Sequence, residues 1–285
     1  MRWVTFVSLL VIGFFMMNLN DAVSQKKSVA KINFLIGKTQ IIQKDAHQIL
    51  EASFNSELYP GDRVETKKES RCEILYHNGN VVRLDENSIY RITRVEEEKK
   101  ETESELSFGK LWANIVKIFS GPQSFDVKTP TAVAAVRGTV YQIKIDSVAS
   151  DFKVFNGSIG VKPVGKDSAS EDSTFVINEG EQMLLVSNFK EYMKQQDEAF
   201  KNFMKEQEEA FEKFMEEDQA AFEEFQKRDE EDFKKFNNLH YLMDKFDMEK
   251  EMKDDWVKWN IERDKALKRE LKMKEEEEGM KKELR

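Results

Sequence analysis

The chain has 285 residues, of which 35% are charged, and 54 acidic residues outnumber 45 basic residues to give a net charge of −9. Because neutralising nucleic-acid phosphates requires a basic face, this balance excludes nucleic acid as the main partner. The single cysteine, Cys72, excludes an intramolecular disulfide and a cysteine-based metal centre. The three histidines are far apart, and we find no glycine-rich phosphate loop or nucleophile elbow. We therefore predict that the protein is not an enzyme and has no catalytic, cofactor-binding or metal-binding residues.

The first 24 residues have the pattern of a signal peptide. Met1-Arg2 gives a short basic start, an apolar run extends from Val4 to Met17, and Ala22-Val23-Ser24 is similar to a small-x-small cleavage site. The run is shorter than the roughly 20 residues that a membrane-spanning helix needs, and the alternative is an uncleaved N-terminal anchor. No cysteine lies near residue 24, which excludes lipoprotein processing there. We expect an exported chain that starts at Gln25 and lies in the periplasm or at the outer membrane.

The remaining sequence divides into two parts of different composition. All four prolines lie before residue 181, whereas the stretch from Phe189 to Arg285 contains a single glycine, 22 basic residues and 30 acidic residues. Sequence that is punctuated by turn residues, followed by unpunctuated charged sequence, indicates an all-β domain at 25–187 and a long α-helical tail at 188–285. Asn188 is placed to cap the first turn of the helix.

Short runs of alternating apolar and polar residues fill the β part. The Asn78-Gly79 dipeptide separates two such runs, at 71–77 and 80–84, and predicts a hairpin with a type I′ turn. The spacing of about ten residues between runs favours a sandwich, barrel or β-roll over βαβ units. Solvated loops are expected at 96–105 and 165–173. Further strands are predicted at 32–35, 39–43, 88–93, 139–145, 152–155, 158–161, 174–177 and 182–186.

Several segments of the β part resemble the FecR domain family. The stretch 58–66, LYPGDRVET, looks like the family's Gly-Asp-x-hydrophobic-x-Thr segment, and Gly109-Lys-Leu-Trp resembles its Gly-x-Leu stretch. The most specific match is 127–141, VKTPTAVAAVRGTVY, which is similar to the family's Thr-Pro…Val-Arg-Gly-Thr segment. The resemblance extends from about residue 29 to residue 187. The matching family-motif residues are Gly61, Asp62, Thr129, Pro130, Arg137, Gly138, Thr139 and Tyr141.

The resemblance implies an all-β, extracytoplasmic domain that works through protein contacts and has no catalytic machinery. In the family's founding regulators, such a domain senses a loaded outer-membrane transporter and signals through a membrane helix to a cytoplasmic segment that controls a sigma factor. Only Met1-Arg2-Trp3 precedes the apolar run here. We therefore expect no cytoplasmic sigma-binding segment and no direct control of a sigma factor.

Two interpretations of the Arg-Gly-Thr element remain open. Gly138 permits a positive φ or a close backbone approach, and Arg137 can pair with a carboxylate such as Asp62. The element is then either a structural corner of the β-domain, which we favour, or an edge that contacts a partner. Trp112 is expected in the core rather than as a platform for a ligand.

The tail repeats an aromatic pattern every eleven residues as far as the expected break at Asn237-Asn238. Eleven residues make three turns, so the repeated positions form one apolar stripe along an otherwise charged helix. Self-association into a coiled coil can cover this stripe, as can another protein, the later segment 239–259, or a membrane surface. Polar residues within the stripe, including Asp218 and Asp229, favour the coiled coil, because they are costly against acyl chains. The stripe consists of Phe189, Tyr192, Phe200, Phe203, Phe211, Phe214, Phe222, Phe225, Phe233 and Phe236.

These patterns predict a non-enzymatic cell-envelope protein, in which a helical tail displays or oligomerises a FecR-like protein-interaction domain. Its partners would be envelope proteins and further copies of the chain bound through the tail, with peripheral membrane association as a further option. The alternative is a periplasmic signalling component that relays the state of an outer-membrane protein to a membrane-bound regulator. A third function is the capture of client proteins by the Phe stripe.

Overall fold

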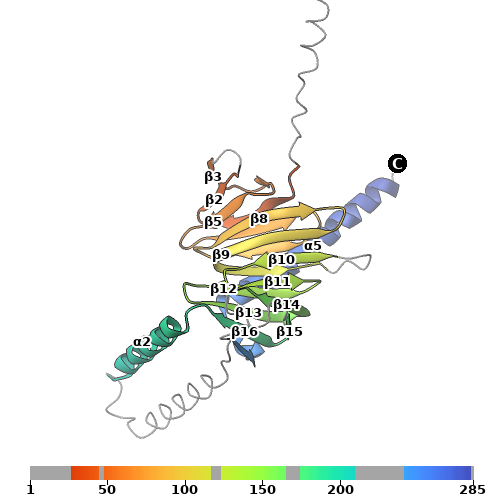
Figure 1. Ribbon diagram of the computed structural model, residues 1–285. Coiled ribbons are helices and arrows are strands. Elements are labelled where there is room, and N and C mark those ends of the chain that lie inside the picture. Colours follow the sequence, from red (N-terminus) through yellow and green to blue (C-terminus); the bar gives the residue numbers. More distant parts are fainter. Residues whose placement is uncertain (1–26, 45–47, 117–122, 165–173, 209–240, 284–285) are drawn as a thin grey trace, which may run out of the picture.

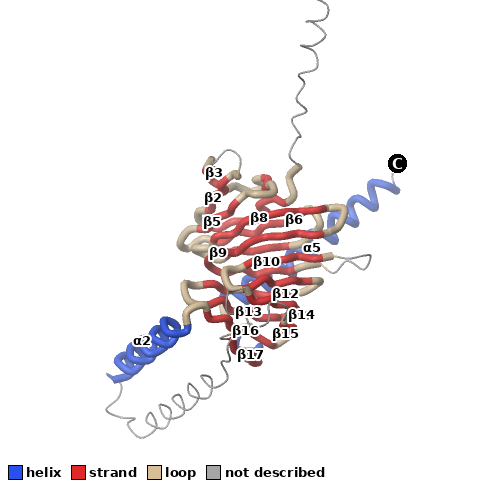
Figure 2. The backbone as a smooth tube through the Cα atoms, in the orientation of Figure 1, coloured by secondary structure: helices blue, strands red, loops and turns tan. Residues whose placement is uncertain are grey.

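The computed structural model describes residues 27–44, 48–116, 123–164, 174–208 and 241–283 (Figure 1). Within these ranges the chain forms 17 strands and a few helices, and the strands pair in two layers that share one strand (Figure 2). The predicted signal peptide at 1–24 and the predicted loop at 165–173 lie outside the described residues.

The first layer, sheet A, has the strand order β4-β1-β6-β7-β9-β12-β13-β16-β17, and all of its neighbours are antiparallel. Its strands are β1 (Ala30–Ile36), β4 (Glu57–Leu58), β6 (Arg71–Tyr76), β7 (Val81–Leu84), β9 (Glu101–Asn114), β12 (Val140–Ile145), β13 (Ala149–Asn156), β16 (Glu181–Val186) and β17 (Tyr241–Lys245).

The second layer, sheet B, has the order β3-β2-β5-β8-β9-β10-β11-β14-β15, and its neighbours are antiparallel except for the parallel pair of β9 and β10. Its remaining strands are β2 (Thr39–Ile42), β3 (Ile49–Glu51), β5 (Arg63–Thr66), β8 (Ile89–Glu96), β10 (Ser124–Lys128), β11 (Ala132–Val136), β14 (Ser158–Pro163) and β15 (Phe175–Asn178).

Strand β9 belongs to both sheets. Its first part, 101–108, pairs with β8, and its second part, 109–114, pairs with β7 and β12. Gly109 lies at the change of sheet with a φ of 96°, and a Cβ there would come within 2.4 Å of the Ser88 Oγ. The position therefore requires glycine.

Most of the predicted strands are confirmed, including the hairpin of β6 and β7 around Asn78-Gly79. The loop predicted at 96–105 is wrong over its second half, where residues 101–105 begin β9. Along this part of β9, the inward positions are taken by Thr102 and Ser104. Because these residues are polar, the alternation that reveals a strand is hidden in a stretch of charged sequence.

The inward faces of the two sheets enclose one apolar core. Its largest members include Tyr76, Tyr90, Phe125 and Phe152, each at most 2% exposed. Cys72 is buried in the same core as a free thiol, and this burial raises the pKa of the thiol to about 12.

Among the described residues, the helices that follow the main run of strands are α2 (Phe189–Glu208), α4 (Met248–Glu251) and α5 (Asp255–Glu283). The predicted cap of α2 is confirmed, because the Asn188 Oδ1 accepts a hydrogen bond of 3.1 Å from the Glu191 N–H. At the start of α2, Phe189 and Tyr192 pack against Val148 and Val186.

The expectation of one helical tail over all of 188–285 is wrong at 241–245, which form strand β17, although 255–283 are helical as α5. Strand β17 pairs with β16 in register, with Leu185 opposite Tyr241, so the chain returns to sheet A. The charged sequence without turn residues predicted helix here, but pairing with the edge of β16 overrides this weak local preference over 241–245. The stripe residues from Phe211 to Phe236 and the predicted break at Asn237-Asn238 lie outside the described residues, as does the Phe203 side chain.

Candidate functional site

The family-motif residues at the start of β5 stabilise a turn. Gly61 has a φ of 98°, and a Cβ there would meet the Lys44 side chain at 2.4 Å. Asp62 is buried, and its Oδ2 accepts a hydrogen bond of 3.0 Å from the Tyr59 N–H. The short polar side chain thus closes the turn that leads into β5.

The Thr-Pro segment also forms a turn, which joins β10 to β11. The buried Thr129 hydroxyl donates a hydrogen bond of 3.0 Å to the Ala132 carbonyl and accepts one of 3.0 Å from the Ala132 N–H. Pro130 is exposed at the tip of this turn.

The Arg-Gly-Thr element lies between β11 and β12. Gly138 has a φ of 66°, and the buried Thr139 donates a hydrogen bond of 2.8 Å to the Ser158 carbonyl. Tyr141 lies in the core, whereas Arg137 is exposed. The element therefore has the geometry of a corner, and the alternative that it is an edge that contacts a partner stays a prediction.

A second and denser group, made of polar and aromatic residues, lies on the outer face of sheet A, away from the main core. One residue from each of eight neighbouring strands forms a row across this face, because the strands are in register. Helix α5 runs along this face, behind the strands in the view of Figure 1. The row consists of Phe34, Glu73, Arg83, Trp112, Gln142, Lys153, Gln182 and Asp244.

An ion pair with no solvent exposure lies at the centre of the contact with α5. The Arg83 Nε donates to the Glu73 Oε2 at 2.6 Å, and both side chains are 0% exposed. The Arg83 Nη1 reaches the helix itself, 3.1 Å from the Asn260 carbonyl and 2.6 Å from the Asp264 Oδ1. One arginine thus joins a carboxylate on β6 to two groups on α5.

Glu73 is bound from the helix as well. The Arg263 Nη2 donates to the Glu73 Oε1 at 2.8 Å, and the Asn33 amide donates to the same oxygen at 2.6 Å. Burial raises the pKa of Glu73, but the hydrogen bonds from Arg263 and Asn33 and the charge of Arg83 outweigh burial and hold this pKa below its ordinary value. Glu73 is therefore ionised, and the two arginines and two carboxylates balance in charge.

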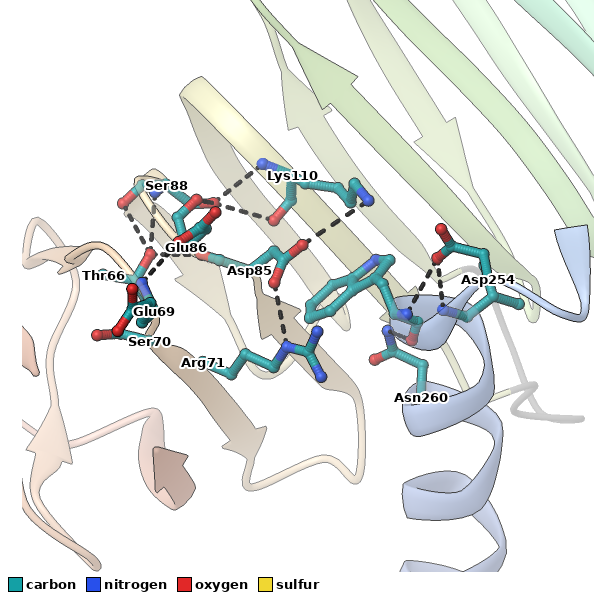
Figure 3. A network of polar contacts seen from close by, with 12 residues as sticks. Thr66, Glu69, Ser70, Arg71, Asp85, Glu86, Ser88, Lys110, Asp254 and Asn260 are labelled. Carbon is teal, nitrogen blue, oxygen red and sulfur yellow. Dashed lines mark hydrogen bonds and ion pairs between the residues drawn. The ribbon is translucent and has the colours of Figure 1, made fainter. Parts of the chain in front are cut away.

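Aromatic rings extend the contact on one side. Trp256 and Trp259 are stacked with ring centroids 5.5 Å apart, and the Arg71 guanidinium lies 5.3 and 5.2 Å from the two centroids. Asp85 fixes Arg71 by accepting a hydrogen bond of 3.1 Å from its Nε (Figure 3). Lys110 lies 3.7 Å from the same carboxylate, and its Nζ is 5.7 Å from the Trp256 centroid. The helix thus presents rings to partly buried cations on the sheet, which is an attractive arrangement.

The N-terminal cap of α5 fixes the position at which the helix begins on this face. The Asp254 Oδ1 accepts hydrogen bonds of 3.0 and 3.2 Å from the N–H groups of Trp256 and Val257, so Asp254 is the cap of the helix (Figure 3). Positions 256, 260, 263 and 267 then follow at helical spacing and face the sheet. The later part of the helix, beyond residue 268, is exposed wherever its side chains are described.

The row continues beneath the chain that leads into α5. Phe155 lies between Trp112 and Phe246, with ring centroids 4.7 and 5.3 Å away. Lys153 forms an ion pair with Glu251 of α4. The segment from Phe246 to Leu267 thus covers the outer face of sheet A with both aromatic and charged side chains.

The sequence did not predict this site. No sequence pattern singled out Glu73 or Arg83, and Trp112 is buried as expected, in a second cluster with Trp256 and Val257 of α5. The available signal was the pair of tryptophans at 256 and 259, because two large aromatic residues beyond the end of a regular repeat need their own cover.

Within the described residues, no group of three or more His, Cys, Asp or Glu side chains is placed to hold a metal ion. In the same part of the chain, no helix is both long and apolar enough to cross a membrane.

Comparison with known proteins gives a family and two solved structures. Residues 62–160 match the model of the family described as FecR protein. A comparison with curated proteins gives no match. Two crystal structures of a candidate anti-sigma factor from Parabacteroides distasonis are similar, each with 16% sequence identity and a TM-score of 0.38, over 44% of this chain. The match covers 55% of the length of those structures, so the chain spans about half of them.

Proposed function

This chain contains a FecR domain at residues 62–160, and on that premise we propose that it acts in signal transduction at the cell envelope through protein contacts. The observation that carries this proposal is the position of the match. It covers β5 to β14, and these strands supply Arg71, Glu73, Arg83 and Trp112, which bind α5. A sheet face that holds a helix by ion pairs and ring contacts has the chemistry of a protein-binding surface.

The proposed route to the envelope is export directed by residues 1–24. Fractionation of the native host, followed by mass spectrometry of the N-terminal peptide, tests this step. We expect a mature N-terminus at Gln25 in the periplasmic or outer-membrane fraction. A full-length chain that stays in the cytoplasm would refute export and, with it, the envelope role.

The signalling role is tested by transcript profiling of a strain that lacks the protein. We expect a defined set of transcripts to change and to be restored by the wild-type chain. Ile143→Asp, which places a charge in the core of the β-domain, should fail to restore them. The matched control is Lys68→Gln on the surface, which should restore them, because the Lys68 side chain is 80% exposed. If the deletion leaves every transcript unchanged while outer-membrane permeability changes, the protein is structural and the proposal fails.

A further inference from the structure

Several buried polar atoms in the contact between α5 and sheet A lack hydrogen-bond partners. Among the described residues these include the Arg83 Nη2, the Trp112 Nε1, the Trp256 Nε1 and the Asn260 Oδ1, and the β-domain has further such atoms elsewhere, as at the Thr39 Oγ1 and the Tyr141 Oη. A permanently packed core normally satisfies such atoms, because each orphaned donor or acceptor reduces stability. Natural proteins depart from this rule mainly at functional surfaces. The unpartnered polar groups in this contact therefore lower the stability of the folded state.

The β-domain has a core of its own beneath this contact. The main apolar cluster draws on both sheets and contains no residue of α5, whereas Trp256 and Val257 form a separate cluster with Trp112. The FecR match likewise ends at residue 160, before β17 and α5. Departure of α5 would thus uncover one face of the sheet without opening the main core.

The chemistry of the uncovered face is specific. It would present the aromatic rings of Phe34 and Trp112 beside an ion pair, Glu73 with Arg83, that α5 completes. Arg83 then needs a carboxylate in the position of Asp264, and Glu73 needs a cation in the position of Arg263. An occupant without these two charges would bury the Glu73–Arg83 pair with fewer of its hydrogen bonds made, which is unfavourable.

We propose that the outer face of sheet A is a helix-binding surface that α5 masks in cis, and that a partner helix of matching chemistry binds it when α5 leaves. The partner is an amphipathic helix with two aromatic residues three positions apart, followed by adjacent basic and acidic residues, as in Trp256, Trp259, Arg263 and Asp264. The masking helix is released as a unit after Asp254, where its cap begins. This inference deepens the proposed function by naming the surface through which the protein contacts would be made.

The test uses the full chain and a labelled synthetic peptide with the sequence of residues 247–271. In the wild-type chain α5 competes with the peptide at a high effective concentration, on the order of millimolar for a short connection, so binding should be weak. The double substitution Trp259→Ala and Arg263→Ala removes helix-side contacts and leaves the sheet unchanged. We expect it to bind the peptide at least about tenfold more tightly than the wild type.

Two matched controls accompany this measurement. The double substitution Lys272→Ala and Glu276→Ala alters an ion pair on the same helix whose side chains are 77% and 62% exposed. This variant should bind the peptide as weakly as the wild type does. A peptide with alanine in place of Trp256, Trp259 and Arg263 should bind neither variant. Equal peptide binding by the Trp259/Arg263 variant and the wild type would overturn the proposal, provided the β-sheet circular dichroism is retained.

Hydrogen exchange of the wild-type chain keeps the proposal testable if that variant does not fold. We expect the amides of 256–267 to exchange through an opening that leaves β6 and β7 protected. Exchange of α5 and β7 through one common opening would overturn the proposal. Neither measurement depends on transcription. If the protein binds the peptide but its deletion alters no transcripts, the signalling role is refuted and the helix-binding surface is retained.

Discussion

Glu73 and Arg83 form an ion pair across neighbouring strands, and neither side chain has any exposure to solvent. An alternating strand pattern gives no sign of this, because charged residues on the outward face of a strand ordinarily remain hydrated. Only the arrival of α5 from 177 positions along the chain makes the pair buried. Sequence patterns of short range therefore predicted the strands but could not predict the site.

Arg83→Met should be among the most destabilising substitutions on the outer face of sheet A. It leaves Asp264 without its cation and removes one of the two cations at Glu73, so we expect a loss of about 3 kcal/mol in the free energy of unfolding. Urea denaturation followed by circular dichroism measures this loss. The control is Arg94→Met in an exposed pair with Glu103, which should leave stability nearly unchanged. Similar losses in both variants would contradict the structural argument.

Gly109→Ala tests the change of sheet in β9. The methyl group would lie 2.4 to 2.7 Å from three atoms of Ser88, at a backbone φ of 96° that alanine rarely adopts. We expect a loss of at least about 2 kcal/mol in the free energy of unfolding. At Gly180 the φ is also positive, at 79°, but nothing lies within 4 Å of the added Cβ. Gly180→Ala should thus be milder, and a reversed order in thermal melting would contradict this account.

The elements that local patterns predicted are those in which inward residues are apolar and turn residues are distinctive. Two examples are the hairpin, predicted from the turn residues Asn78-Gly79, and the start of α2, predicted from the cap residue Asn188. Two elements escaped for physical reasons. The first part of β9 places Thr102 and Ser104 inward, and β17 owes its conformation to the free edge of β16. The FecR resemblance predicted more of the β-domain than periodicity alone did, but it gave no information on α5.

Removal of each helix cap should loosen one helix and spare the other. Asp254→Ala deprives the N–H groups of Trp256 and Val257 of their acceptor, so we expect about 1 kcal/mol less protection of the first turns of α5, or roughly a fivefold faster exchange. Asn188→Ala should do the same for the start of α2. Hydrogen exchange with mass spectrometry resolves the two helices. Faster exchange of both helices in either variant would mean that they do not open separately.

At the scale of the whole molecule, the chain leaves sheet A after β16 and returns to it beside β16 as β17. The aromatic repeat is therefore flanked on both sides by strands of one sheet, rather than ending the molecule as a stalk. Self-association through the repeat stays a prediction, and its first members, Phe189 and Tyr192, already lie against Val148 and Val186. The return of the chain also places the connection to α5 beside β13, where Lys153 forms an ion pair with Glu251.

Asp151 on β13 faces this connection and gives the stability of the molecule an unusual dependence on pH. Burial is the main cause that raises its pKa from 3.8 to about 6, and Glu251 and Asp146 raise it further, while Lys153 and Lys144 act in the opposite direction. The folded state thus holds the Asp151 proton more tightly than the unfolded state. The stabilisation that follows is complete below about pH 3.8 and is lost as the pH rises through 6.

Asp151→Asn should therefore stabilise the protein at pH 7.5, by an amount on the order of 2 kcal/mol, and have little effect at pH 4. The free energy of unfolding, measured by urea denaturation at half-unit steps of pH, gives the difference between variant and wild type. Taking this difference removes the titration of the other carboxylates, among which Glu73 acts with the opposite sign, because its lowered pKa makes stability fall in acid. A flat difference for Asp151→Asn would show that this carboxyl group titrates as it does in the unfolded chain, and that α4 and the outer face of sheet A do not enclose it.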